Sequence, residues 1–134
     1  MLVRTITVLA LFAAPLPALA LDDCFTSSVG PWRGPVWNRY GLQTMDTEFQ
    51  AGPDGTLTGS YRIHDWQPFD GTLTDFRRTG PCEADFVWHD RDGSGVVHIR
   101  FEPDSGRFIG TWGQTAPVPD LLFNGYRVGP DVIS

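Results

Sequence analysis

The residues best suited to chemistry in this sequence are three histidines with acidic neighbours. His64-Asp65 and His89-Asp90 are adjacent pairs, and His98 follows a short turn later. Neighbouring residues of a strand point to opposite faces of a sheet, so neither adjacent pair makes a catalytic dyad. His89 and His98 would approach each other if the strand register allowed it, and would then suit metal binding or acid–base catalysis. The alternative is that both lie on a solvated sheet face.

The turn between these two histidines matches the first eight positions of an EF-hand calcium loop. Oxygen ligands would come from Asp90, Asp92 and Ser94, with Gly95 at the sharp turn. The twelfth position, which should be a bidentate glutamate, is Phe101, and the flanking residues have the pattern of strands. We therefore expect a polar hairpin turn, with weak calcium binding as the one cofactor left open.

Other catalytic motifs are missing from the sequence. It has no Gly-x-Ser-x-Gly, no His-Glu-x-x-His and no phosphate-binding loop, and its serines fall in turns. An enzyme is therefore not indicated, and a catalytic function would depend on the two histidines above.

Tryptophan is the strongest remaining signal, with five in the chain. Trp88 and Trp112 fall in phase with apolar neighbours, so we expect them inside the fold, where tryptophan fills cores or lines ligand mouths. Trp66 and Trp32 stand in Gly- or Pro-flanked segments that indicate loops. These two are the candidates for exposed contacts, unless both loops fold back and plug the ends of the domain.

The elements that would position these residues are short strands. Apolar residues recur at every second position between turns rich in Gly, Pro and Asp, and no window shows the spacing of a long helix. The predicted strands cover 45–49, 57–63, 68–73, 84–89, 96–101, 108–112 and 121–128. This pattern predicts a single all-β domain, an antiparallel meander or up-and-down barrel of about seven to eight strands.

The N-terminal residues predict export. Residues 1–20 combine Arg4, an apolar run too short to span a bilayer and small residues at 18–20, which is typical of a signal peptide. The alternative is a helix that belongs to the fold. Residues 21–134 would then form the single β domain, in the periplasm or outside the cell.

The two cysteines support this compartment. Cys24 and Cys82 are the only ones, and a pair in an exported chain usually forms a disulfide. Because the loop between them is long, the bridge would stabilise the fold by roughly 4 kcal/mol. The alternative is a pair of free thiols.

The charge distribution excludes some partners. The formal net charge is −6, and all ten basic residues are arginines scattered along the chain. Nucleic acids and anionic membranes require a basic stripe, so neither is an expected partner. No segment after the predicted signal is apolar enough to cross a membrane.

Part of the first half resembles the avidin and streptavidin family. Trp37-Asn38 with a glycine three residues on resembles its first strand, and residues 51–61 resemble its second hairpin. The resemblance implies an eight-stranded meander barrel with a ligand pocket at one end, in which Asn38 and Tyr61 match residues that hold the ureido group of biotin. The family has a serine where this chain has Ile63, and its later pocket tryptophans have no counterparts in spacing, so biotin binding is not implied.

Three functions fit these observations. The first is a non-catalytic binding module for a small ligand or a protein, which predicts an open aromatic cavity. The second is a periplasmic protease inhibitor of barrel type, which predicts a filled barrel and an exposed N-terminal segment. The third is a small metal-dependent or hydrolytic enzyme, which predicts that His89 and His98 converge. The candidate ligand-binding residues are Asn38, Tyr61, Trp66, Trp88 and Trp112.

Overall fold

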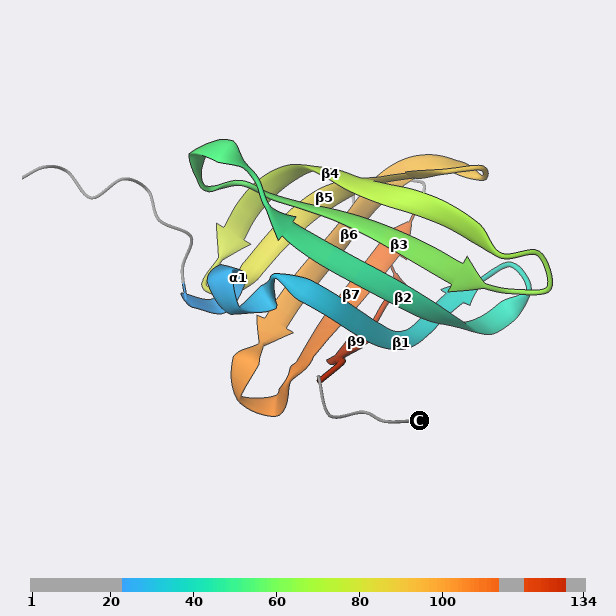
Figure 1. The fold of residues 1–134 in the computed structure, drawn as a ribbon. Helices are drawn as coiled ribbons and strands as arrows, with labels where there is room; N and C mark the ends of the chain where they lie inside the picture. Colours follow the sequence, from blue (N-terminus) through green and yellow to red (C-terminus); the bar gives the residue numbers. More distant parts are fainter. Residues whose placement is uncertain (1–22, 114–119, 130–134) are drawn as a thin grey trace, which may run out of the picture.

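The computed structural model describes residues 23–113 and 120–129. They form one antiparallel sheet that closes into an eight-stranded barrel with one extra strand (Figure 1). The all-β barrel predicted from the sequence is therefore confirmed. The predicted signal peptide, residues 1–20, lies outside the described residues.

Nine strands, one α-helix and two 3₁₀ turns make up the described part of the chain. In chain order they are α1 (Asp23–Ser28), β1 (Gly30–Asn38), β2 (Gly41–Ala51), η1 (Pro53–Gly55), β3 (Leu57–His64), β4 (Phe69–Gly80), β5 (Glu83–Asp90), β6 (Gly93–Glu102), η2 (Pro103–Ser105), β7 (Arg107–Gly113), β8 (Leu121–Leu122) and β9 (Gly125–Arg127).

The strands are connected as a meander that closes through its last segment. Each strand from β1 to β7 pairs with the next, and the short β9 pairs with both β7 and β1. The segment predicted as one strand over 121–128 is two short strands, so that prediction is corrected. Its break falls at Asn124, whose side-chain oxygen accepts a hydrogen bond from Gly110 N–H at 3.1 Å. The backbone of Asn124 also lies so close to Gly34 that no side chain would fit there.

The predicted two-residue alternation places side chains as expected. Met45 and Phe49 on β2 are fully buried. On β6, Val97, Ile99 and Phe101 are buried, while the alternate residues Val96 and Arg100 are exposed. The barrel interior is therefore a packed apolar core, and the solvated face carries most of the charges.

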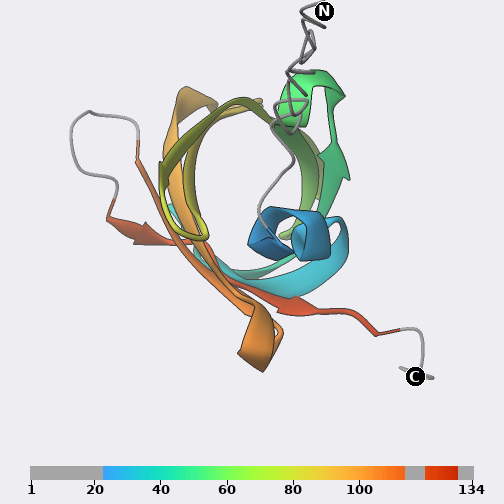
Figure 2. The same cartoon turned by 90° about the vertical axis from the view of Figure 1, so that its left-hand side faces the viewer.

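Helix α1 covers one end of the barrel, as the end-on view shows (Figure 2). Phe25 of α1 is 1 % exposed, and its ring meets Phe76 and Phe101 edge-on with centroids 5.2 and 5.9 Å apart. Cys24 forms the predicted disulfide with Cys82, which confirms that pairing. This end of the barrel is thus closed by a helix that is covalently held to the turn between β4 and β5.

The prediction of a loop around Trp32 is wrong, because this residue lies in β1. Trp32 is 4 % exposed, and its indole N–H donates to the carbonyl oxygen of Ser28 at 2.8 Å. The prolines beside it suggested a loop, but β1 pairs with β9 only through Trp32 and Arg33. A strand with one partly unpaired side tolerates residues that lack an N–H.

The described residues contain no helix that combines the length and the apolar character needed to cross a membrane.

Candidate functional site

The end of the barrel opposite α1 contains a small pocket. The β1–β2, β3–β4 and β5–β6 turns meet at this end, because alternate turns of a meander lie on the same side. The pocket has a volume of about 30 Å³, enough for one or two water molecules. Its lining consists of Val36, Asn38, Tyr61, Ile63, Phe69, Trp88, Asp90, Asp92, Trp112 and Phe123.

Four of the five residues proposed from the sequence as ligand-binding line this pocket. Asn38 comes from β1, Tyr61 from β3, Trp88 from β5 and Trp112 from β7, so the barrel brings together residues far apart in the chain. Trp66 is not among them: it lies in the β3–β4 turn and is 73 % exposed.

Tyr61 supplies a hydroxyl group to the inner end of the pocket. Its hydroxyl donates a hydrogen bond to Oδ2 of Asp90 at 2.7 Å, and Asp90 Oδ1 accepts from the backbone N–H of Asp92 at 2.8 Å. Burial, together with the hydrogen bond to Asp90, raises the pKa of Tyr61 far above its ordinary value. The phenol therefore stays neutral, and its ring fits there because Gly71 on β4, directly opposite, has no side chain.

Asn38 presents an unused hydrogen-bond donor to the pocket. The residue is 7 % exposed, and its side-chain oxygen accepts from the backbone N–H of Tyr40 at 2.9 Å. This contact fixes which amide atom is the oxygen. The amide nitrogen makes no hydrogen bond to any of the described residues, so a group with an acceptor oxygen would satisfy it.

Two tryptophans make the apolar wall. The rings of Trp88 and Trp112 meet edge-to-face, with centroids 5.2 Å apart and planes at 84°. The indole N–H of Trp88 donates to Gly113 O at 3.2 Å, and that of Trp112 donates to Trp37 O at 2.9 Å. Because both N–H groups are already used, the two side chains offer a ligand only their carbon surfaces.

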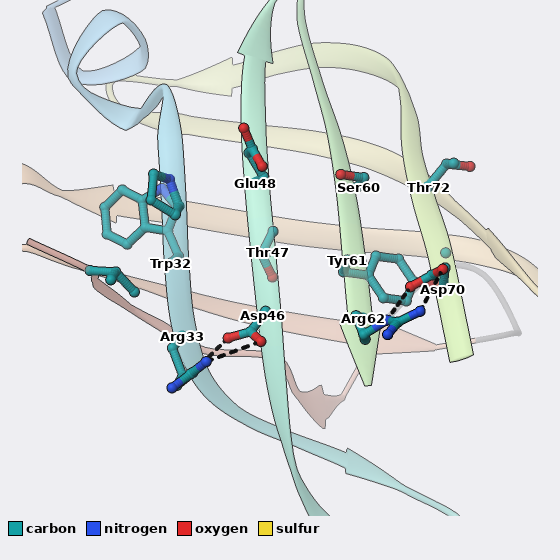
Figure 3. A pocket seen from close by; sticks show the side chains of 13 residues that line it. Trp32, Arg33, Asp46, Thr47, Glu48, Ser60, Tyr61, Arg62, Asp70 and Thr72 are labelled. Carbon is teal, nitrogen blue, oxygen red and sulfur yellow. Dashed lines mark hydrogen bonds and ion pairs between the residues drawn. The ribbon is translucent and has the colours of Figure 1, made fainter. Parts of the chain in front are cut away.

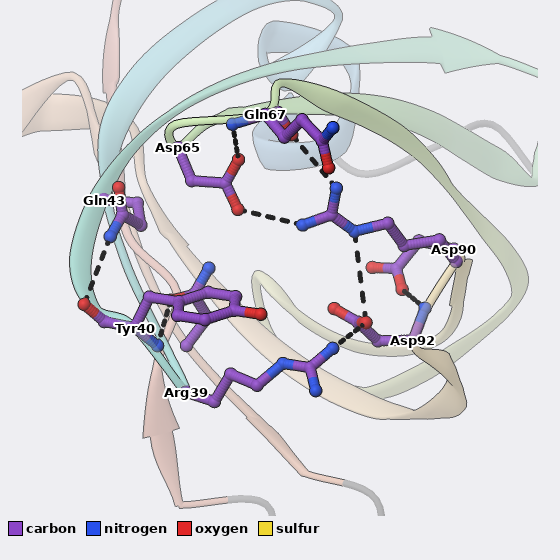
Figure 4. Close-up of polar contacts among 9 residues, drawn as sticks. Arg39, Tyr40, Gln43, Asp65, Gln67, Asp90 and Asp92 are labelled. Carbon is purple, nitrogen blue, oxygen red and sulfur yellow. Dashed lines mark hydrogen bonds and ion pairs between the residues drawn. The ribbon is translucent and has the colours of Figure 1, made fainter.

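Charged residues surround the mouth of the pocket (Figure 4). Arg39, from the β1–β2 turn, donates to Oδ1 of Asp92 at 2.6 Å across the opening. The Arg39 side chain is 64 % exposed, so this ion pair is worth about 1 kcal/mol or less.

A second arginine is held more firmly at the rim. Arg91 donates to Oδ2 of Asp65 at 3.0 Å and to Gln67 O at 3.0 Å. Its guanidinium also lies over the Phe69 ring, 3.8 Å from the centroid, in a cation–π contact. The Asp65 side chain is fully covered, so this pair is a fixed part of the rim.

The histidines of the catalytic hypothesis do not converge. In the β5–β6 register His98 faces Asp85, and His89 lies four residues further along β5. That offset corresponds to about 13 Å along the strand. His98 Nδ1 lies 2.7 Å from Asp85 Oδ1, whereas His89 Nε2 lies 3.2 Å from Thr74 Oγ1. Each histidine therefore makes its own contacts on the outer face of the sheet.

The carboxylates proposed as calcium ligands already accept hydrogen bonds from other groups of the protein. The carboxylate oxygens of Asp90 accept from Tyr61 and from the Asp92 backbone, and Asp92 Oδ1 accepts from Arg39. Ser94 stands on β6, opposite His89. Among residues 23–113 and 120–129, no group of three or more His, Cys, Asp or Glu residues is arranged to hold a metal ion.

A second hollow lies outside the barrel, across β1 to β4 (Figure 3). It is a groove of about 590 Å³ whose lower row of charges forms two pairs: Arg33 with Asp46 at 2.6 Å, and Arg62 with Asp70 at 2.8 Å. Trp32 and Tyr61 also line the groove, but each is only 4 % exposed. Because the opposite charges neutralise each other and these rings are buried, the groove offers less specific recognition than the mouth.

Exposed apolar side chains gather at the same end as the pocket. Trp37, Tyr40 and Leu42 on the β1–β2 hairpin and Trp66 on the next turn are each at least 47 % exposed. A larger ligand seated at the mouth would therefore meet an apolar rim beyond the charged residues.

Several pocket and rim residues were missed from the sequence. Arg39, Asp65 and Arg91 stand in three different turns. Phe69 is the first residue of β4, and Phe123 forms an isolated bridge with Val36. The meander topology could have predicted them, because alternate turns of a meander lie at the same end of the barrel and bring their charged residues together.

No protein-family model matches this chain, and no curated protein matches it. The resemblance to avidin and streptavidin therefore stays a prediction, and the function has to be argued from the geometry of the pocket.

Proposed function

We propose that this protein is an exported, non-catalytic binding module whose site is the pocket at the open end of the barrel. The observation that carries this proposal is the amide of Asn38: the residue is 7 % exposed, it lines an aromatic-walled pocket, and its amide nitrogen makes no hydrogen bond to a described residue. A donor that opens into a pocket and is not used by the protein can bind an acceptor oxygen of a ligand, so the site favours an occupant that carries one.

The shape of the site limits how a ligand binds. At about 30 Å³ the pocket admits one small polar head and not a whole cofactor. The rest of the ligand would lie on the exposed rim side chains, of which Trp37, Tyr40 and Trp66 are the largest. The disulfide between Cys24 and Cys82 supports a periplasmic or extracellular location, because such bonds persist in oxidising compartments.

The proposal is tested by mapping where small fragments bind. Propionamide, n-propanol and propionate are titrated separately into the disulfide-bonded protein, and the ¹H–¹⁵N NMR spectrum is followed. We expect propionamide to shift the indole signals of Trp88 and Trp112 and to leave that of Trp32, at the α1 end, unchanged. Shifts confined to the outer groove or to the α1 end, or no shift with any fragment, would overturn the proposal.

A protease inhibitor of barrel type is the second candidate, and the packed interior favours it. The core leaves only a small cavity, so recognition would use the exposed mouth. Residues 21–22, where an inhibitory N-terminal segment would begin, lie outside the described residues. This candidate rests on analogy between folds. It predicts stoichiometric inhibition of at least one protease of a serine, cysteine and metalloprotease panel, and no inhibition across the panel would rule against it.

A further inference from the structure

The charged residues of the pocket indicate whether it favours an anionic or a cationic group of a ligand. Of the described residues, two carboxylates, Asp90 and Asp92, belong to the lining, and no lysine, arginine or histidine does. The remaining polar groups of the lining are the hydroxyl of Tyr61 and the amide of Asn38. Asp92 is paired with Arg39 at 2.6 Å and lies 4.0 Å from Arg91 Nε, whereas Asp90 accepts from two neutral donors, the Tyr61 hydroxyl and the Asp92 backbone N–H. Asp90 would therefore repel an anionic head and attract a cationic one.

The aromatic walls favour the same sign of charge. Trp88, Trp112, Phe69 and Tyr61 surround the carboxylates, and the faces of aromatic rings attract cations. The protein already contains one such cation–π contact at the rim, where the Arg91 guanidinium lies 3.8 Å from the centroid of the Phe69 ring.

Asn38 adds an independent requirement. The residue is 7 % exposed, and its amide NH₂ has no partner among the described residues. An NH₂ group only donates, so the group that meets it must supply an acceptor oxygen. Both requirements act inside about 30 Å³, so the cationic nitrogen and the oxygen must be only a few bonds apart.

We infer that the mouth pocket recognises a primary ammonium group with a carbonyl oxygen on the adjacent carbon, the chemistry shared by amino-acid amides and the amino terminus of a polypeptide. The ammonium lies against Asp90 and Asp92 between the aromatic rings, and the carbonyl accepts from the amide of Asn38. This inference rests on the proposed function, since it names the ligand class of the same site.

Arg39 competes with the ligand for the carboxylate of Asp92. It is bound to Asp92 at 2.6 Å, and its exposed side chain can swing into water at little energetic cost. Arg91 stays in place, because it covers Asp65. Its Nε also lies 4.0 Å from Asp92 Oδ1, so Asp92 keeps this more distant cation. Binding therefore exchanges Arg39 for the ammonium of the ligand, and removing the charge of Arg39 strengthens binding.

The test compares four probes of similar size by the indole shifts of Trp88 and Trp112. They are glycinamide, propylamine, propionamide and propionate. We expect glycinamide to bind most tightly, at least threefold more tightly than propylamine or propionamide, and propionate to produce no shift. Triglycine amide against its N-acetylated form then distinguishes the sources: binding of the free-amine peptide as tight as glycinamide or tighter assigns a polypeptide amino terminus, and weaker binding assigns a free amino-acid amide.

Two variants test the charges, each with a matched control in the outer groove. Arg39→Gln should tighten glycinamide binding about threefold and Asp92→Asn should weaken it about tenfold, whereas Arg62→Gln and Asp70→Asn should leave it unchanged. If propionamide shifts the two indoles but glycinamide and propylamine bind no more tightly, the ammonium inference is wrong and the proposed function stands. If no probe shifts them, both are wrong.

Discussion

The hydroxyl of Tyr61 on β3 donates a hydrogen bond to Oδ2 of Asp90 at the end of β5, over a distance of 2.7 Å. The two strands are separated by β4 in the sheet, so this bond crosses the interior just below the mouth. It holds a carboxylate at the edge of an apolar core and fixes the floor of the pocket.

Replacement of Tyr61 by Phe should destabilise the protein. The change removes one donor from a partly buried carboxylate, and hydrogen bonds to charged groups are worth about 2 kcal/mol. Chemical denaturation should show a loss of about that size in the free energy of unfolding. Tyr126→Phe is the matched control, because Tyr126 is 52 % exposed and should change stability by less than about 0.5 kcal/mol. Equal effects of the two variants would contradict a specific role for the Tyr61–Asp90 bond.

Stability should fall at alkaline pH because of the same residue. In the unfolded chain Tyr61 ionises near its ordinary pKa of 10.0, whereas burial raises the pKa far above that in the folded protein. The folded state thus keeps a proton that the unfolded state loses, so the stabilisation present below pH 10 is lost as the pH rises above it. Unfolding curves at pH about 8 and about 10.5 should show this loss in the wild type. The loss should be smaller in Tyr61→Phe, and the same loss in both proteins would show that other groups cause it.

Thr47 should be replaceable by valine without loss. The residue is 3 % exposed, faces Tyr61 in the sheet register, and its hydroxyl has no hydrogen-bond partner among the described residues. Valine has nearly the same shape and removes an unsatisfied polar atom, so we expect the free energy of unfolding to rise by about 1 kcal/mol. Thr44→Val, on the exposed face of the same strand, should have little effect. A loss of stability specific to Thr47→Val would reveal a partner for the hydroxyl.

The disulfide should stabilise the barrel without shaping the pocket. Cys24 and Cys82 are 58 residues apart, so in the chain-entropy model the bridge contributes about 4 kcal/mol. A double replacement by serine should lower the free energy of unfolding by about that amount, and so should reduction of the wild type. The NMR shifts of Trp88 and Trp112 should stay unchanged, because both lie at the opposite end. A change in those shifts would mean that α1 controls the mouth.

The sequence predicted the barrel well where local patterns decide the structure. Alternation over 45–49 and 96–101 identified strands and their buried faces, and the two cysteines identified their pairing. Strand β1 was missed around Trp32, because Gly and Pro indicate turns, and only its partial pairing with β9 explains why a strand tolerates them there.

The site was predictable in part. Asn38, Tyr61, Trp88 and Trp112 were chosen from resemblance and from phase, and the barrel brings all four to one pocket. Convergence of His89 and His98 depended on register, which the spacing of residues across the turn could not decide. The ion pair between Arg39 and Asp92 joins turns far apart in the chain, so it emerges only when the meander closes.

The central claim, that the mouth pocket binds a ligand through Asn38, is tested most directly by one pair of titrations with propionamide. Asn38→Asp keeps the oxygen that accepts from Tyr40 and replaces only the amide NH₂. Asn124→Asp is the matched control, since its oxygen also accepts a backbone N–H, from Gly110, outside the pocket. We predict that Asn38→Asp weakens binding about tenfold, as measured by the Trp88 and Trp112 indole shifts, and that Asn124→Asp leaves it unchanged. Equal affinity of wild type and Asn38→Asp would contradict the claim.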